Sequence, residues 1–196
     1  ERDYLLHMWI ERLGNALESS QGFVEMDHAD QPLAAVALMI HADSLLFIRR
    51  AEDERDPWSG HMAFPGGRFD ADDQGLEQTA RREVREEIGV DLSGALLLGS
   101  LPPVSSPALA PRISVAPFVF GLREPPVFCL AEKEVSSVHW YGLDGLTRGD
   151  GRGHFPYIYR GVRHQLPCID DGERRIWGMT LRIVDDLLER LGVVHS

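Results

Sequence analysis

The sequence predicts an α+β fold in which helices cover a mixed β-sheet. Apolar runs and alternating segments typical of strands recur between residues 33 and 166. Amphipathic patterns of helical period stand near both ends of the chain, and a third helical pattern interrupts the strands at residues 74–88. Strands interleaved with helices in this order suit a mixed sheet with helices on its faces.

The composition restricts the function classes. With 196 residues, the chain is expected to form one domain with elaborations. Its net charge of −11 argues against a general nucleic-acid binder, which needs a basic face to neutralise phosphates. The two cysteines, Cys129 and Cys168, indicate no disulfide framework, and no apolar run approaches the ~20 residues of a membrane span. No signal peptide is recognisable, so we expect a cytoplasmic protein that binds neither membranes nor nucleic acids.

The N-terminal segment is predicted to form an amphipathic helix. Over residues 4–17, apolar side chains recur at helical spacing, namely Leu6, Trp9, Ile10, Leu13 and Leu17. We expect this helix to pack on the domain, with a partner-binding helix as the alternative. Residues 21–31 are mostly polar and form a predicted linker. The chain is accordingly divided into residues 1–30, the helix and linker, and residues 31–196, the main domain.

Strands are predicted, in chain order, at residues 33–40, 45–48, 95–101, 114–120, 135–141, 157–159 and 163–166. The first two form a predicted hairpin of buried strands, and the last two form another. The densely charged residues 49–57 are a predicted loop, and the glycine-rich residues 149–153 a flexible segment. The proline-rich residues 102–111 are either a substrate-recognition loop or a plain connection. A C-terminal amphipathic helix is predicted from Trp177 onwards.

The helix predicted at residues 74–88 carries an unusual cluster of acids. Glu83, Glu86 and Glu87 are spaced i, i+3, i+4, which stacks their side chains on one helix face. Carboxylates crowded on one turn repel each other, and a hard cation such as Mg²⁺ or Mn²⁺ removes the conflict. The alternative is a solvated helix face whose glutamates pair with Arg81, Arg82 and Arg85.

The segments that flank this helix favour the metal site. Pro65, Gly66 and Gly67 form a turn that brings backbone close to whatever the glutamates hold. Gly89 is a helix-ending residue directly after the acidic turn. Asp73 is the candidate N-cap. The apolar residues Ala80, Val84 and Ile88 are expected to dock the helix on the sheet, and Asp70, Asp72 and Asp73 are expected to be solvated loop acids.

Gly67, followed by Arg82-Glu83-Val84-Arg85-Glu86-Glu87-Ile88-Gly89-Val90, resembles the box of the Nudix family. The nine residues from Arg82 match at every fixed position. The first half is one residue longer than the family pattern, and Gln74 stands where the family has a glutamate. Residues 63–67, 101–104, 132–136 and 177–180 are similar to the coenzyme A pyrophosphatase branch, although Trp58 occupies a position where that branch has histidine.

The resemblance implies the Nudix α/β/α sandwich and a metal-dependent hydrolase. It implies Mg²⁺ or Mn²⁺ bound by Glu83, Glu86, Glu87 and the Gly67 carbonyl, and a catalytic set of Glu86, Glu83, Arg82 and Glu134. In that set Arg82 orients a box glutamate. The general base is either a box glutamate or an acid on a later loop, for which Glu134, or else Glu132, is the candidate.

The implied reaction is hydrolysis of the diphosphate linkage of a nucleoside diphosphate derivative. Coenzyme A is the leading substrate, and ADP-ribose, dinucleotides and nucleotide sugars are the alternatives. A hypothesis from another class is a non-catalytic module that senses a nucleotide. The end helices are compatible with a homodimer. His61 is expected to pack in the turn, and Trp58, Phe69 and Tyr157 to belong to the core rather than to stack on adenine.

Overall fold

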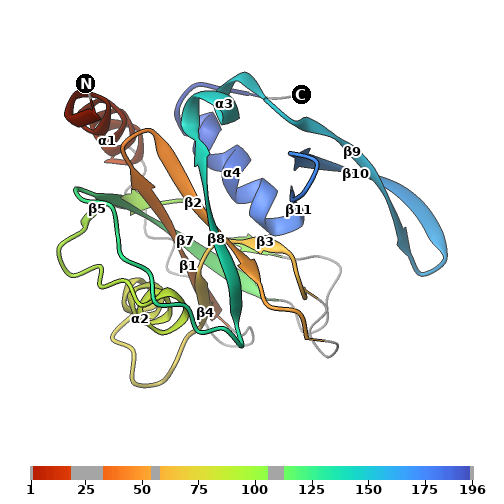
Figure 1. Cartoon of the computed structure of the whole chain (residues 1–196), viewed down its shortest axis with the longest axis horizontal. Helices are drawn as coiled ribbons and strands as arrows, with labels where there is room; N and C mark the ends of the chain where they lie inside the picture. The colour runs from red at the N-terminus through yellow and green to blue at the C-terminus, as the bar shows by residue number, and fades with distance from the viewer. Residues whose placement is uncertain (1, 19–32, 54–57, 106–112, 195–196) are drawn as a thin grey trace.

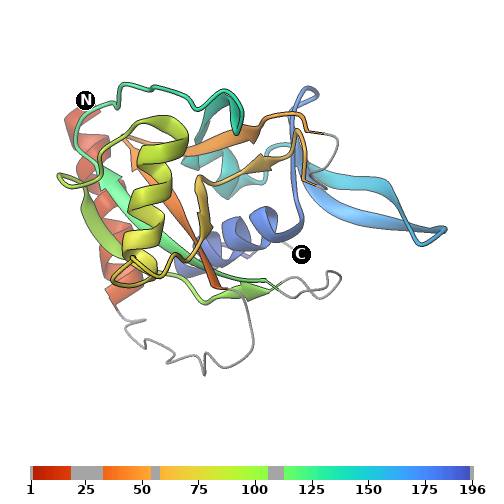
Figure 2. The ribbon, with the colours of Figure 1, turned by 90° about the horizontal axis from the view of Figure 1, so that it is seen from below.

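The computed structural model describes residues 2–18, 33–53, 58–105 and 113–194, and it shows a mixed sheet between helices (Figure 1). Helix α2 lies on one face, and α1 and α4 lie on the other (Figures 1 and 2). This is the predicted α+β sandwich. The elements are α1 Arg2–Glu18, β1 Leu33–His41, β2 Ser44–Arg50, β3 Met62–Ala63, β4 Gly66–Arg68, α2 Leu76–Ile88, β5 Leu96–Ser100, β6 Val104–Ser105, β7 Ser114–Leu122, β8 Val135–Gly142, α3 Leu143–Arg148, β9 Arg152–Tyr159, β10 Val162–Asp170, β11 Arg175–Trp177 and α4 Gly178–Arg190.

The larger sheet has eight strands, with a path β3-β2-β1-β7-β5 to which β4, β6 and β8 are added. Strands β1 and β7 run parallel, and the other pairs are antiparallel. Strands β1 and β2 pair only beside their turn, at residues 40–41 and 44–45. Further along, β1 pairs with β4 and β2 pairs with β3. The short strands β3 and β4 therefore occupy the end of the sheet where β1 and β2 separate.

Both faces of the larger sheet are buried, which explains the continuous apolar runs of β1 and β2. Along β2, Leu45 and Phe47 belong to the core beneath α1 and α4, whereas Leu46 and Ile48 belong to the core beneath α2. Successive side chains of a strand point to opposite faces, so one uninterrupted run supplies both cores. The predicted hairpin of buried strands is confirmed.

Helix α1 packs on the domain, as predicted, because Trp9, Leu13 and Leu17 are fully buried in the core that contains α4. The proposed linker at 21–31 lies outside the described residues, as do residues 106–111 of the proline-rich segment and 54–57 of the charged loop. Within the described ranges, none of the helices has the length and apolar character needed to cross a membrane.

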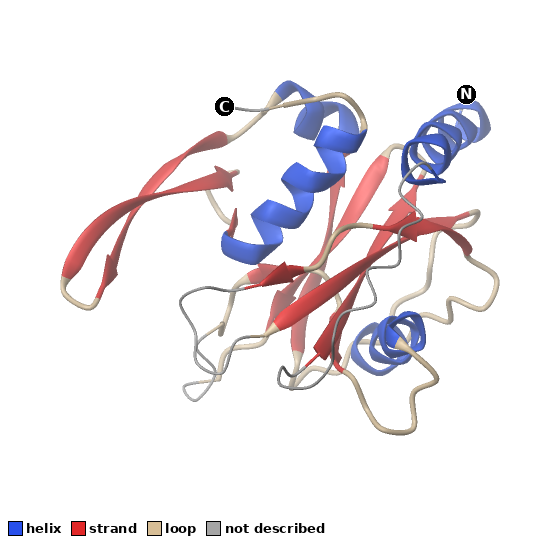
Figure 3. Cartoon of the chain, turned by 180° about the vertical axis from the view of Figure 1, so that it is seen from behind, coloured by secondary structure: helices blue, strands red, loops and turns tan. Residues whose placement is uncertain are grey.

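A second, three-stranded sheet has the order β11-β10-β9. Its β9–β10 hairpin projects from the body of the molecule (Figures 1 and 3). The predicted hairpin is confirmed, but its strands are longer, running from Arg152 to Tyr159 and from Val162 to Asp170. Sequence periodicity missed the base of this hairpin, residues 152–156 and 167–170, because glycine, proline and charged residues interrupt any apolar alternation there.

Three features of the local structure differ from the sequence analysis. The charged loop does not begin at Arg49, because β2 continues to Arg50 by pairing with β8. Helix α3, Leu143–Arg148, was not predicted, since six residues are too few to show a helical period. The glycine-rich residues 149–153 form a hydrogen-bonded turn: Gly149 ends α3 in the left-handed conformation, and β9 begins at Arg152.

Gly89 ends α2, and its replacement by alanine should destabilise the fold. Its φ of +72° is left-handed, and a Cβ there would lie 2.7 Å from the Cβ of Cys129. We expect Gly89→Ala to lower the free energy of unfolding by about 1 kcal/mol or more. Gly94→Ala is the matched control, because nothing lies within 4 Å of a Cβ built at Gly94. Urea unfolding of both variants measures the effect, and equal stability of the two would contradict it.

Candidate active site

Helix α2 is mounted on the sheet by one stripe and presents its acids along another. Ala80, Val84 and Ile88 are fully buried in the core beneath the helix, as predicted. On the neighbouring stripe Glu87 is 3% exposed, while the Glu86 side chain is 56% exposed. The acidic cluster therefore grades from buried to solvent-exposed along the helix surface.

The glycine turn contacts this cluster directly. The backbone N–H of Gly66 donates a hydrogen bond of 2.9 Å to Oε2 of Glu87. A Cβ built on Gly67 would lie 2.4 Å from the Glu83 carboxylate, and one on Gly66 would lie 2.2 Å from the Ala35 carbonyl oxygen. Only residues without a side chain allow β4 to approach both the helix and β1 so closely. The structure thus brings Gly67, Glu83 and Glu87 together, as predicted.

Arg82 links the other acids of the site. Its Nη1 atom donates to Glu83 Oε1 at 2.8 Å and to Glu86 Oε2 at 2.9 Å. Its Nε and Nη2 atoms each donate to Asp73 at 3.0 Å, and Nη2 also donates to the Arg68 carbonyl. The hydrogen bond to Asp73 raises the pKa of Arg82 further above its ordinary value. A fork of this kind fixes the guanidinium, and with it two box glutamates.

Asp73 is neither the N-cap nor a solvated acid. Gly75 precedes the helix without a side-chain cap, whereas Asp73 is 8% exposed and accepts a 2.8 Å hydrogen bond from Thr79 Oγ1. Its bonds with Arg82 lower its pKa to about 2. Gln74, at the family's glutamate position, has only its backbone N–H engaged, with Gln78. Asp73 therefore supplies the carboxylate that holds Arg82, from the position one residue before Gln74. The longer loop accommodates this shift.

The electrostatics of the cluster fit a bound cation. Burial raises the pKa of Glu87 to about 8; the Gly66 N–H opposes this, and the charge of Glu83 adds to it. Burial also raises the pKa of Glu83. Asp73, Glu83 and Glu86 share the single guanidinium of Arg82, so negative charge exceeds positive charge in the cluster. Carboxylate oxygen atoms are the ligands that Mg²⁺ and Mn²⁺ prefer. Among the described residues no three acidic, histidine or cysteine side chains converge as metal ligands, because Glu83 and Glu86 turn to Arg82.

Glu134 lies at the border of this site. It immediately precedes β8, its carbonyl accepts a 2.8 Å hydrogen bond from Ala51 N–H, and its side chain is exposed. Its charge contributes to raising the pKa of both Glu83 and Glu87. The predicted base is thus electrostatically coupled to the acidic cluster, although it lies 47 residues beyond Glu87 in the sequence.

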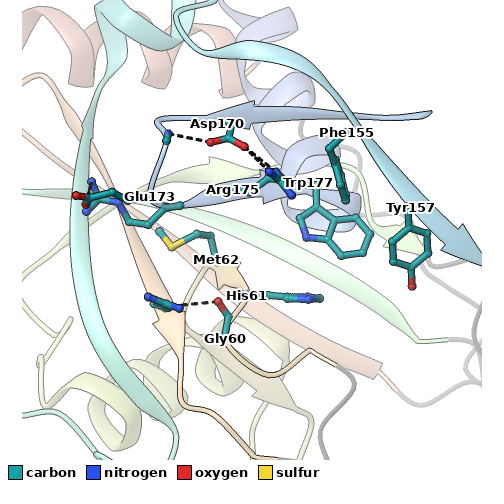
Figure 4. Close-up of a pocket in the computed structure, with 12 residues that line it drawn as sticks. Gly60, His61, Met62, Phe155, Tyr157, Asp170, Glu173, Arg175 and Trp177 are labelled. Carbon is teal, nitrogen blue, oxygen red and sulfur yellow. Dashed lines mark hydrogen bonds and ion pairs between the residues drawn. The ribbon is translucent and has the colours of Figure 1, made fainter. Parts of the chain in front are cut away.

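The aromatic residues differ from expectation. Phe69 is 41% exposed and is not part of the core. Tyr157 lines a pocket of about 390 Å³ together with His61, Phe155 and Trp177 (Figure 4). His61 does pack beside the turn, against Trp177 at a ring separation of 5.0 Å. Sequence reasoning did not find this pocket, because its walls come from segments almost a hundred residues apart.

The fold and the site together define a class of protein. A mixed sheet lies between helices, and a double-glycine turn contacts the glutamates of one helix, as in a Nudix hydrolase domain. The model of the NUDIX domain matches residues 30–160 of this chain. The chain belongs to the Nudix family.

Solved structures show the same fold. The MutT protein of Methanosarcina mazei Go1 matches 84% of this chain and 95% of its own, with a TM-score of 0.54 and 18% identity. A UDP-X diphosphatase matches 89% of this chain and 70% of its own, with a TM-score of 0.51 and 15% identity. At such identities the likeness concerns the fold alone.

Sequence relatives are more similar. The mitochondrial coenzyme A diphosphatase NUDT8 of Homo sapiens is 32% identical over 149 residues, 76% of this chain and 63% of that protein. The uncharacterized Nudix hydrolase NudL of Yersinia pestis (strain Pestoides F) is 32% identical over 152 residues, 76% of this chain and 73% of that one. An uncharacterized Schizosaccharomyces pombe protein is 40% identical over 107 residues, and the chain spans 32% of its length. The chain thus spans less than two thirds of the length of the human and yeast relatives.

Proposed function

We propose that this protein hydrolyses the diphosphate linkage of a nucleoside diphosphate derivative, with Mg²⁺ or Mn²⁺ as its cofactor. The observation that carries this proposal is the contact between the glycine turn and the buried acids of α2. Glu87 is held by Gly66 N–H, and the Glu83 carboxylate lies against Gly67. A buried, negatively charged cluster repels an anionic diphosphate unless cations lie between the two.

Each residue has a proposed role in this reaction. Glu83, Glu86, Glu87 and the Gly67 carbonyl would hold the metal, which would neutralise the phosphates and acidify a bound water. Arg82 holds the carboxylates of Glu83 and Glu86, and Asp73 holds Arg82. Glu134 is the candidate base that accepts the proton of the attacking water. A box glutamate is the alternative base.

Coenzyme A is the proposed substrate. This choice is supported by the 32% identity with the human mitochondrial coenzyme A diphosphatase and by the four segments similar to that branch. Trp58, which replaces a histidine of the branch, argues for testing other derivatives beside it. Those derivatives are ADP-ribose, dinucleotides and nucleotide sugars. We further propose a cytoplasmic protein whose partner is this small molecule.

A substrate panel tests the proposal. Coenzyme A, ADP-ribose, NADH, diadenosine polyphosphates and nucleoside triphosphates are incubated with the protein in Mg²⁺, in Mn²⁺ and in EDTA, and the products are separated by chromatography. We expect coenzyme A to be cleaved to 3′,5′-ADP and phosphopantetheine in the metal buffers and to survive in EDTA. Preference for another diphosphate would overturn the substrate, and a lack of turnover of every compound would favour a non-catalytic nucleotide sensor.

A further inference from the structure

The pocket of about 390 Å³ lies beneath the base of the projecting hairpin. Its walls come from the end of β2, from β3 and the residues before it, from β9, and from β10, β11 and the turn between them (Figure 4). A volume of this size suits one small-molecule group, and sites for such ligands are typically lined by aromatic side chains with a few polar groups. The function proposed above assigns no part of the substrate to it.

One wall is aromatic. The Trp177 ring lies 5.3 Å from Phe155, 5.2 Å from Tyr157 and 5.0 Å from His61, measured between ring centroids. Phe155, Tyr157 and Trp177 are each only partly buried, so their rings keep surface on the pocket side. Trp177 packs edge-to-face with Phe155 and His61 and is tilted by 47° to Tyr157. A flat ligand ring gains stacking energy on a ring face that borders the pocket.

The pocket lining carries three arginines, Arg49, Arg174 and Arg175, against two acids, Asp170 and Glu173. The Arg175 guanidinium lies 4.4 Å from the centre of the Phe155 ring and is oriented by Asp170 at 2.8 Å. On the opposite side Arg49 donates to the Gly60 carbonyl at 3.3 Å. Both arginines belong to the pocket lining. The site therefore combines aromatic rings with one more guanidinium than carboxylate, which suits a ligand that joins an aromatic ring to anionic groups.

The pocket and the acidic cluster are joined by one short segment. His61 and Met62 line the pocket, and Gly66 donates to Glu87. Because Met62 and Gly66 are four residues apart, their Cα atoms are separated by at most about 14 Å. An extended nucleotide spans such a separation from its base to its phosphates.

We propose that this pocket binds the aromatic base of the nucleotide substrate, with Tyr157 and Trp177 as the stacking residues and the diphosphate directed toward the Gly66–Gly67 turn. The proposal rests on the proposed function, because it places one end of that substrate. A base is favoured over a pantetheine chain because a flexible, saturated chain has no flat face to stack on the rings.

Tyr157 tests the proposal through steady-state kinetics. The variant Tyr157→Leu loses one base-stacking ring. Its KM should rise about tenfold, and its kcat should change little. Tyr157→Phe keeps the ring and should keep the KM of the unmodified protein. Tyr159→Leu is the matched control, since Tyr159 lies on the same strand, contacts Arg160 and is not part of the pocket lining. An equal KM in Tyr157→Leu and Tyr159→Leu would overturn the proposal.

A binding measurement separates this proposal from the proposed hydrolysis. Saturation-transfer NMR is recorded with AMP and, separately, with pantetheine, in EDTA so that no turnover occurs. We expect saturation to reach the adenine protons of AMP, and to be lost in Tyr157→Leu but retained in Tyr159→Leu. This result would support the pocket even if the substrate panel showed no hydrolysis. Saturation transfer to pantetheine that is lost in Tyr157→Leu, with no transfer to the adenine protons of AMP, would overturn the assignment of the pocket to the nucleotide base.

Discussion

Glu86→Gln should lower kcat about a hundredfold to a thousandfold, because it removes the charge of a proposed metal ligand that would act where the transition-state charge develops. The free energy of unfolding should change by less than about 0.5 kcal/mol, since surface substitutions of this kind rarely change it more. The Glu86 side chain is 56% exposed, which supports the expected small change in the free energy of unfolding. Rate and stability therefore separate in this variant, which distinguishes a functional carboxylate from a structural one.

The measurement is kcat in Mg²⁺ with the preferred substrate of the panel, together with urea unfolding. Glu77→Gln is the matched control: Glu77 lies on the same helix, pairs with Arg81 at 2.8 Å and stands away from the glycine turn. Its kcat should stay within about twofold of the unmodified protein, as for surface changes distant from a site. If Glu86→Gln retains comparable turnover, Glu86 is not a metal ligand and the solvated-face interpretation of α2 gains support.

Asp73→Ala should have a large effect on both stability and rate. The carboxylate is buried and holds Arg82 through two hydrogen bonds of 3.0 Å. The substitution removes the carboxylate that both the Arg82 guanidinium and the Thr79 hydroxyl contact. The loss of these hydrogen bonds should lower the free energy of unfolding by about 2–4 kcal/mol. Arg82 then loses its orientation toward Glu83 and Glu86, and kcat should fall about tenfold to a hundredfold.

Asp72→Ala provides the comparison, because Asp72 is the exposed neighbour in the same loop. Urea unfolding and kcat should both remain near the values of the unmodified protein. The contrary outcome is a stable, fully active Asp73→Ala variant, which would show that Arg82 is held well enough by Glu83, Glu86 and the Arg68 carbonyl. A Gln74→Ala variant that lost activity would instead assign the role to the family's glutamate position.

Local sequence was enough to predict the acidic helix and its support. Helical geometry alone places residues i, i+3 and i+4 on one face, so Glu83, Glu86 and Glu87 are neighbours wherever the helix forms. The same period places Ala80, Val84 and Ile88 on the buried stripe. The double glycine before the helix indicated a close approach, and the structure shows the Glu83 carboxylate where a Gly67 side chain would stand.

The missed features depend on contacts between distant segments. The pocket unites His61 with Tyr157 and Trp177, a pairing that no periodicity within one segment records. Glu134, whose charge reaches the box glutamates, is likewise distant in sequence, and it was predicted from the family resemblance rather than from a local pattern.

By itself, the sequence determined the fold class, the acidic face of α2 and the glycine turn, because short-range geometry and hydrophobic period act within a few residues. Only the tertiary structure decided that Asp73 holds Arg82 and that Trp177 packs against His61 as well as against the hairpin rings of Phe155 and Tyr157. Both outcomes depend on how elements pack. Asp73 turns inward because the partly buried Arg82 and the buried Thr79 offer it partners, and the rings meet because β11 pairs with β10 of the hairpin and lies beside β3.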